Sequence, residues 1–238
     1  MPATKRNIRQ QSLSTTTSKM IYLPDTKSAI VLTQKTAGSF VRTAVRSYGG
    51  NQIHVKHPCD LSAAKERYPG LVNAFTLVRH PIAWYRSYWA EKVVFGYGWG
   101  GNYLLGADER CRKDDFNEFV LASCKCYPGY LTELFSRCTG FVNHNSQVCV
   151  GKTENVADDL IGFMTQAGEQ FDSQAISRMS PVRVQASTPR VRDTCRCSKE
   201  AAEAIYESER CIFEKYGYSK AVPPYTVVSP EQQGALKQ

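Results

Sequence analysis

Two short segments carry residue types that bind phosphate-like anions. The first is Gln34-Lys35-Thr36-Ala37-Gly38-Ser39-Phe40. Its small residues let backbone N–H groups turn toward an anion at a helix N-terminus, while Lys35 adds a charge and Ser39 a hydroxyl. The glycine–lysine order of nucleoside-triphosphate loops is absent, because Lys35 precedes Gly38. The segment therefore predicts an anion-binding loop, and by itself fits a plain strand-to-helix turn equally well.

The second segment begins at Arg79 and continues to Ser87, eight residues further along the chain. The planar guanidinium of an arginine suits a phosphate group, and a serine hydroxyl can add a shorter hydrogen bond. The alternative is an arginine paired with a carboxylate and a serine on a solvated helix face. Taken alone, this segment is a weak indication of a second phosphate site.

Strands that alternate with helices must position these residues. A continuous apolar run is typical of a strand buried on both faces. The expected strands are 29–32, 53–55, 71–78 and 148–151, and the expected helices are 40–48, 61–68, 81–94, one capped by Asn155 and a long one from Ser198 to Gly217. This pattern predicts an α/β fold, a three-layer αβα arrangement with a central parallel sheet. Ligands bind beyond the carboxyl ends of such strands, where both segments start.

Together the two segments resemble the donor-binding elements of the sulfotransferase family that uses 3′-phosphoadenosine-5′-phosphosulfate (PAPS). The Lys35 loop is similar to that family's 5′-phosphosulfate loop, and Phe75-Thr76-Leu77-Val78-Arg79-His80-Pro81 with Ser87 is similar to its 3′-phosphate site. Residues 150–155 and 213–218 also resemble later family segments. The family often has glycine where Ala37 stands, and an arginine where Trp84 stands.

The resemblance implies a P-loop-like strand–loop–helix and sulfuryl transfer from PAPS to an acceptor hydroxyl or amine, with 3′,5′-adenosine bisphosphate (PAP) as product and no metal. Lys35, Thr36, Ala37, Gly38, Ser39 and Phe40 would hold the 5′ end, and Arg79 and Ser87 the 3′-phosphate. Lys35 would also stabilise the leaving group. A base must take the acceptor's proton. His57 stands where many relatives carry that base, with His54 and a carboxylate such as Glu66 as alternatives.

The acceptor is left open between glycans, phenols and tyrosine peptides. Aromatic residues interleaved with glycines predict either a core helix and loop or a wall for a sugar or phenol ring; they are Tyr88, Trp89, Phe95, Tyr97, Trp99 and Tyr103. The net charge is +8. It is concentrated in residues 1–20 and 178–199, which favours a compact anionic ligand or an acidic acceptor over general nucleic-acid binding.

The competing interpretations are a nucleotide or small-molecule kinase with a similar phosphate loop and a non-enzymatic basic RNA-binding protein. We expect a disordered basic tail over 1–20, a sulfotransferase domain over 21–222 and a C-terminal tail over 223–238. No signal peptide or membrane-spanning run is recognised, which predicts a cytoplasmic protein, although residues 1–20 also have the composition of a transit peptide. Most of the nine cysteines are expected to be reduced thiols, with one or two disulfides or a metal site as alternatives.

Overall fold

The structure is a computed structural model that describes residues 19–55, 61–99, 104–139, 148–179 and 194–223. The described chain divides into two compact units. The first unit combines residues 1–79, 101–108 and 131–180, and the second combines residues 80–100, 109–130 and 181–238. Each unit is described by itself. The expected tails at 1–20 and 223–238 fall almost entirely outside the described residues, as does most of the basic segment 178–199.

The first unit is built on a five-stranded sheet in the order β3-β1-β2-β4-β5. The strands are β1 (Lys19–Leu23), β2 (Ser28–Leu32), β3 (Ile53–Val55), β4 (Asn73–Val78) and β5 (Val148–Lys152). Strands β2, β4 and β5 pair in parallel, as the apolar runs predicted. All five residues of β2 are buried, which agrees with a strand covered on both faces.

The expectation of a wholly parallel sheet is wrong, because β1 runs antiparallel to both of its neighbours, β2 and β3. The turn between β1 and β2 contains Pro24 and is closed by a hydrogen bond from the Lys27 amide to the Pro24 carbonyl, 3.2 Å long. Lys27 has a φ of 50°. A tight turn joins antiparallel strands directly, whereas a parallel pair needs a longer crossover. The sheet is therefore mixed, and β1 alone has the reverse direction.

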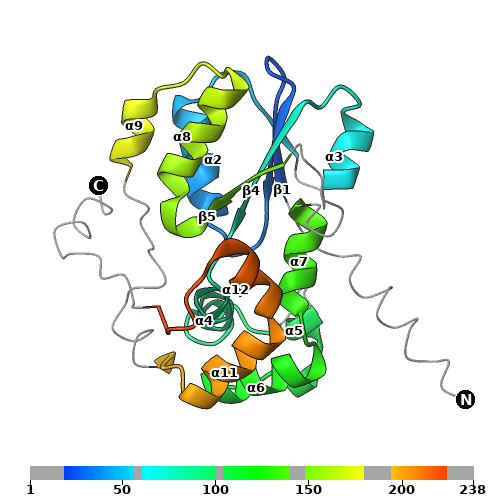
Figure 1. Cartoon of the computed structure of the whole chain (residues 1–238), viewed down its shortest axis with the longest axis vertical. Coiled ribbons are helices and arrows are strands. Elements are labelled where there is room, and N and C mark those ends of the chain that lie inside the picture. The colour runs from blue at the N-terminus through cyan, green and yellow to red at the C-terminus, as the bar shows by residue number, and fades with distance from the viewer. Residues whose placement is uncertain (1–18, 56–60, 100–103, 140–147, 180–193, 224–238) are drawn as a thin grey trace, which may run out of the picture. The chain divides into compact units, whose positions relative to one another are not determined.

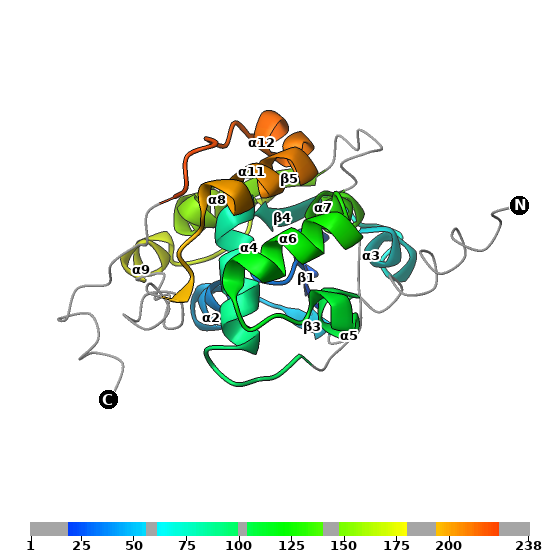
Figure 2. The same ribbon diagram turned by 90° about the horizontal axis from the view of Figure 1, so that it is seen from below.

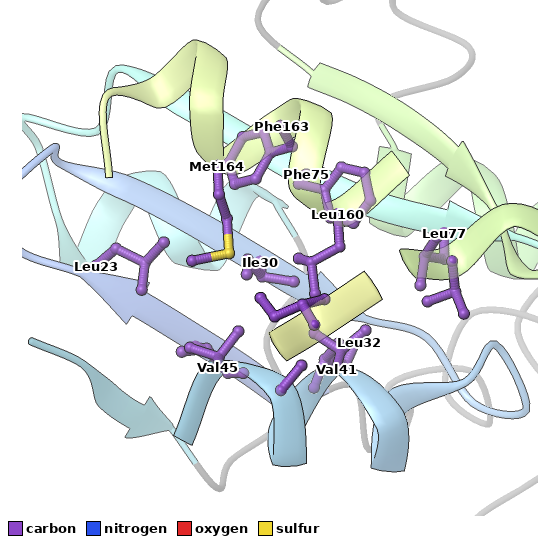
Figure 3. Packing of buried hydrophobic residues seen from close by; sticks show 14 residues of the cluster. Leu23, Ile30, Leu32, Val41, Val45, Phe75, Leu77, Leu160, Phe163 and Met164 are labelled. Atoms are coloured by element: carbon purple, nitrogen blue, oxygen red, sulfur yellow. The ribbon is translucent and has the colours of Figure 1, made fainter. Parts of the chain in front are cut away.

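Helices cover both faces of this sheet, which makes the first unit a three-layer αβα arrangement (Figure 1). On one face lie α2 (Gly38–Tyr48), α8 (Val156–Ala167) and α9 (Ser173–Arg178), and on the other lies α3 (Leu61–Arg67). Figure 3 shows Val41 and Val45 of α2 turned toward Ile30 and Leu32 of the sheet. The unit also contains α5 (Leu104–Ala107) and all but the first residue of α7 (Tyr130–Thr139).

The second unit is helical. It contains α4 (Pro81–Lys92), the short 3-10 helix Glu109–Cys111, α6 (Phe116–Cys126), α11 (Lys199–Ser208) and α12 (Arg210–Tyr216). Helix α11 packs against α6 and α4, as Figures 1 and 2 show. Pro81 occupies the first position of α4, where its missing N–H is no loss. The Ser198 hydroxyl caps α11 by accepting a 3.0 Å hydrogen bond from the Ala201 amide.

Two local predictions fail in detail. The helix expected from Ser198 to Gly217 is divided at Glu209 into α11 and α12. Glu209 is fully buried and its carboxylate accepts a 2.9 Å hydrogen bond from the Tyr85 hydroxyl, so a contact with a distant residue accompanies the break. Asn155 does precede α8, but its side chain makes no capping hydrogen bond.

Candidate functional site

The candidate site lies where the three parallel strands of the first unit end. The segment Thr33–Ala37 follows β2, Arg79 follows β4, and Thr153 follows β5. Because β4 pairs with both β2 and β5, these three ends are neighbours at one edge of the sheet. The prediction that the strand ends place the Lys35 loop and Arg79 at a common edge agrees with this topology.

The loop after β2 has an unusual backbone. Lys35 and Ala37 adopt left-handed conformations with φ of 63° and 59°, and Ala37 is directly followed by the right-handed helix α2. A left-handed residue next to a right-handed one turns successive N–H groups toward a common point, which forms an anion-binding concavity. Buried Thr36 closes the loop from inside, since its hydroxyl donates a 2.8 Å hydrogen bond to the Thr33 carbonyl.

Arg79 lies directly against this loop. Its Nη1 donates a 3.0 Å hydrogen bond to the Lys35 carbonyl, across 44 residues of chain. Only 7% of Arg79 is exposed, so its charge is held in a largely dry position beside the loop. The hydroxyl of Thr153 donates a 3.0 Å hydrogen bond to the Val78 carbonyl, which ties the end of β4 to the end of β5. Arg79, where the second predicted segment begins, therefore lies beside the first predicted segment.

Close packing beneath the site fixes β5 against α8. A Cβ built on Gly151 would stand 2.8 Å from Asp159 Cβ and 2.9 Å from Phe75 Cζ. The same close approach lets Asp159 Oδ2 accept a 2.6 Å hydrogen bond from the Lys152 amide. Glycine is thus required at position 151 by space, and the aspartate holds the last residue of β5 in place.

Arg42 extends the loop along α2. Its Nη2 donates a 3.1 Å hydrogen bond to the hydroxyl of exposed Ser39, and its Nη1 lies 3.4 Å from the position a Gly38 Cβ would take. Partial burial lowers the pKa of Arg42 from its ordinary value, and the nearby Arg46 lowers it further. The contact of Arg42 with Ser39 was not predicted from the sequence. The i,i+3 spacing of the two residues is the signal that could have indicated it.

The candidate bases are His57, His54 and Glu66. His57 lies outside the described residues. His54 is on β3, where its Nε2 is 2.8 Å from Gln52 Oε1. Partial burial lowers the pKa of His54, and Arg46 and Arg42 lower it further, which favours the neutral imidazole. Glu66 is exposed on α3, the helix that covers the opposite face of the sheet from α2.

Ser87 and the aromatic residues from Tyr88 to Trp99 belong to the second unit. Ser87 is half-buried on α4. Tyr88 and Trp89 are buried in this unit's core, which agrees with the core-helix interpretation. Trp99 packs on Phe119 with ring centroids 5.5 Å apart. Tyr97 is 66% exposed, and Tyr103 lies outside the described residues.

The eight cysteines within the described residues are free thiols. Burial raises the pKa of Cys124 and of Cys195 to about 12. In the part of the chain that the structure describes, no group of three or more His, Cys, Asp or Glu side chains is arranged to hold a metal ion. The described helices include none with the length and apolar character needed to span a membrane.

Comparison of the chain with protein-family models, with curated proteins and with solved structures finds no match. A strained, glycine-containing loop at a helix N-terminus with a lysine and a neighbouring buried arginine is suited to an anion that carries more than one negative charge.

Proposed function

We propose that this protein is a sulfotransferase that moves a sulfuryl group from PAPS to a hydroxyl or amine of an acceptor. The observation that carries the proposal is the 3.0 Å hydrogen bond from Arg79 Nη1 to the Lys35 carbonyl. Lys35 and Arg79, expected at the two charged ends of the donor, lie 44 residues apart in the sequence, yet they adjoin in the first unit. Had they lain on separate surfaces, one adenosine donor could not bridge them.

The loop backbone gives independent support. Left-handed backbone at Lys35 and Ala37 is costly for residues with a side chain, and such strain concentrates where a ligand is gripped. Amide groups converging at the N-terminus of α2 suit the 5′-phosphosulfate, with Ser39 adding a hydroxyl. The P-loop-like character expected from the sequence is part of the proposal.

In this mechanism the acceptor oxygen or nitrogen attacks sulfur in line, and the bond from sulfur to the 5′-phosphate oxygen breaks. Lys35 neutralises the charge that develops on the leaving phosphate oxygen. The acceptor proton passes to His57, for which the family resemblance is the support. Arg79 binds the 3′-phosphate. Ser87 is assigned to the same phosphate from its sequence spacing alone.

Calorimetric titration with PAP, without magnesium, tests the donor site. We expect saturable binding, weakened about tenfold or more in Lys35→Ala and in Arg79→Lys, because a charge-assisted hydrogen bond contributes roughly 1.5–3 kcal/mol. Lys65→Ala on α3 is the matched control, since it removes a lysine from the other face of the sheet. Tight binding of magnesium–ATP together with no binding of PAP would replace this proposal with the kinase interpretation.

Turnover tests the base separately from the donor. His57→Ala should abolish sulfuryl transfer in an acceptor screen over glycans, phenols and tyrosine peptides, while the affinity for PAP stays unchanged. If His57→Ala retains turnover and His54→Ala loses it, the proton acceptor is His54. Binding of structured RNA with no effect of Lys35→Ala would favour the RNA-binding interpretation.

A further inference from the structure

Beside the Lys35 loop, three basic side chains of the first unit gather on α2 and β3. Arg42 and Arg46 are one turn apart on α2, so their side chains are neighbours on the helix surface. Arg46 is exposed and Arg42 half-buried. Val41 and Val45, which precede them, are buried against the sheet. Arg42 contacts the loop at Ser39. The two arginines thus form a basic surface that begins beside the loop and continues along α2.

His54 lies on the same side of the sheet. It is directly opposite Ile21 in the antiparallel pair of β3 and β1, and opposed residues share a face. Ile21 belongs to the hydrophobic cluster under α2. Gln52 links the histidine to this helix, since its Oε1 contacts His54 Nε2 and its Nε2 donates a 2.8 Å hydrogen bond to the Val45 carbonyl.

The charges in this cluster repel one another. The neighbouring charges that act on His54 are Arg46 and Arg42, and the one that acts on Arg42 is Arg46. Holding like charges together is unfavourable unless something compensates for it. An anion placed over the cluster would gain from both guanidinium groups, which are suited to bidentate binding of a carboxylate or sulfate.

We infer that Arg42, Arg46 and His54 form a second oxyanion subsite, which binds a carboxylate or sulfate of an acidic oligosaccharide acceptor. The acceptor class rests on the proposed function, because a sulfuryl acceptor must offer a hydroxyl or an amine as well as the anion. The polar character of the cluster supports an oligosaccharide over a peptide. Peptide interfaces are anchored by buried aromatic and apolar side chains, whereas this cluster presents arginines, a histidine and Gln52.

Direct binding of a chondroitin tetrasaccharide, measured without any donor, tests the subsite. We expect its affinity to fall about fivefold to tenfold in Arg46→Gln and in Arg42→Gln, the loss expected for one partly exposed charge-assisted contact. The affinity of the unaltered protein should also fall as salt rises from about 50 to about 200 mM, and this dependence should be weaker in both variants. Lys65→Gln on α3 should bind as the unaltered protein does.

Arg46→Gln is the decisive variant, because Arg42 contacts Ser39 and its loss can disturb the donor loop. In Arg46→Gln the affinity for PAP should change less than about twofold, since Arg46 lies in the last turn of α2, at the opposite end of the helix from the loop. A circular-dichroism melt confirms that each variant is folded. If the unaltered protein does not bind PAP, the proposed function is refuted. The tetrasaccharide measurement, which uses no donor, still tests the subsite.

Three results would overturn the subsite itself. One is equal affinity for the carboxyl-reduced tetrasaccharide, in which each carboxylate is replaced by an uncharged hydroxymethyl group. Another is an equal loss of affinity in Lys65→Gln, which would indicate diffuse attraction to the whole surface. The third is binding of an acidic peptide or an oligonucleotide at this cluster with no binding of the tetrasaccharide.

Discussion

Replacing Ala37 by glycine should stabilise the protein, although glycine normally weakens a helix. Ala37 has φ 59° and ψ 23° and precedes the first residue of α2. A residue with a Cβ costs roughly 1–2 kcal/mol in this left-handed conformation. Glycine removes that cost, while its greater backbone freedom when unfolded takes back roughly 0.5–1 kcal/mol. The free energy of unfolding should therefore rise, by up to about 1.5 kcal/mol.

Ala44→Gly is the matched control, because the same chemical change is made in the same helix at a right-handed position. Ala44 is fully buried in the core under α2. Glycine in a helix interior costs about 1 kcal/mol, and the lost methyl contact adds to that cost. This variant should lose roughly 1.5–2 kcal/mol. The two substitutions thus change stability in opposite directions.

Urea unfolding at 25 °C, followed by circular dichroism, measures both effects. For a chain of this size each kcal/mol shifts the melting temperature by about 2–4 °C, so a thermal melt gives a second readout. Ala37→Gly should also keep its affinity for PAP, since the backbone N–H groups stay in place. A destabilised Ala37→Gly would refute the left-handed loop, and with it the converging amides on which the donor site depends.

Further perturbations test the packing, the histidine and the thiols. Gly151→Ala should lower the free energy of unfolding by about 1–3 kcal/mol, because its methyl group would meet Phe75 and Asp159. Gly162→Ala, at an open helical position, should raise it by about 1 kcal/mol. Equal effects of the two substitutions would contradict the close approach of α8. The pKa of His54 is lowered, so unfolding free energy should fall as pH drops below about 6.5, and His54→Gln should flatten that slope between pH ~7.5 and ~5.5. Iodoacetamide at pH ~8 should modify exposed Cys211 before Cys124, whose pKa burial raises to about 12; early labelling of Cys124, read by mass spectrometry, would contradict its burial.

Local patterns were sufficient for the parallel strands and for the starts of α3, α4, α8 and α11, whereas α5, α6, α7 and α9 were not predicted. The apolar run at 29–32 predicted a strand covered on both faces, and β2 is fully buried. The expected helix 81–94 begins at the same residue as α4, and the expected helix 40–48 ends at the same residue as α2. These predictions succeed because each depends on the residue's own backbone preference or on burial along one short segment.

Features that depend on distant partners were not predicted. The antiparallel direction of β1 comes from its pairing with β2 and β3, although the Pro24 turn offered a local signal. The break at Glu209 coincides with a hydrogen bond from Tyr85, 124 residues away. The sequence predicted that the Lys35 loop and Arg79 start at strand ends of one sheet, but their direct contact needs the pairing of β2 with β4.

Because of the strand order, the proposed donor site and the proposed acceptor subsite lie at different positions along one edge of the sheet. Strand β3 runs in the same direction as β2, because each is antiparallel to β1, which lies between them. Neighbouring strands are about 4.8 Å apart, so β3 and β2 are separated by roughly 10 Å. The Lys35 loop and Arg79 belong to the adjacent pair β2 and β4, whereas His54 belongs to β3. Arg42 contacts Ser39 of the loop and also lowers the pKa of His54, so α2 connects the two places. A donor held at β2 and β4 would then leave the β3 side of the edge for an acceptor, which is the division of space that in-line transfer requires.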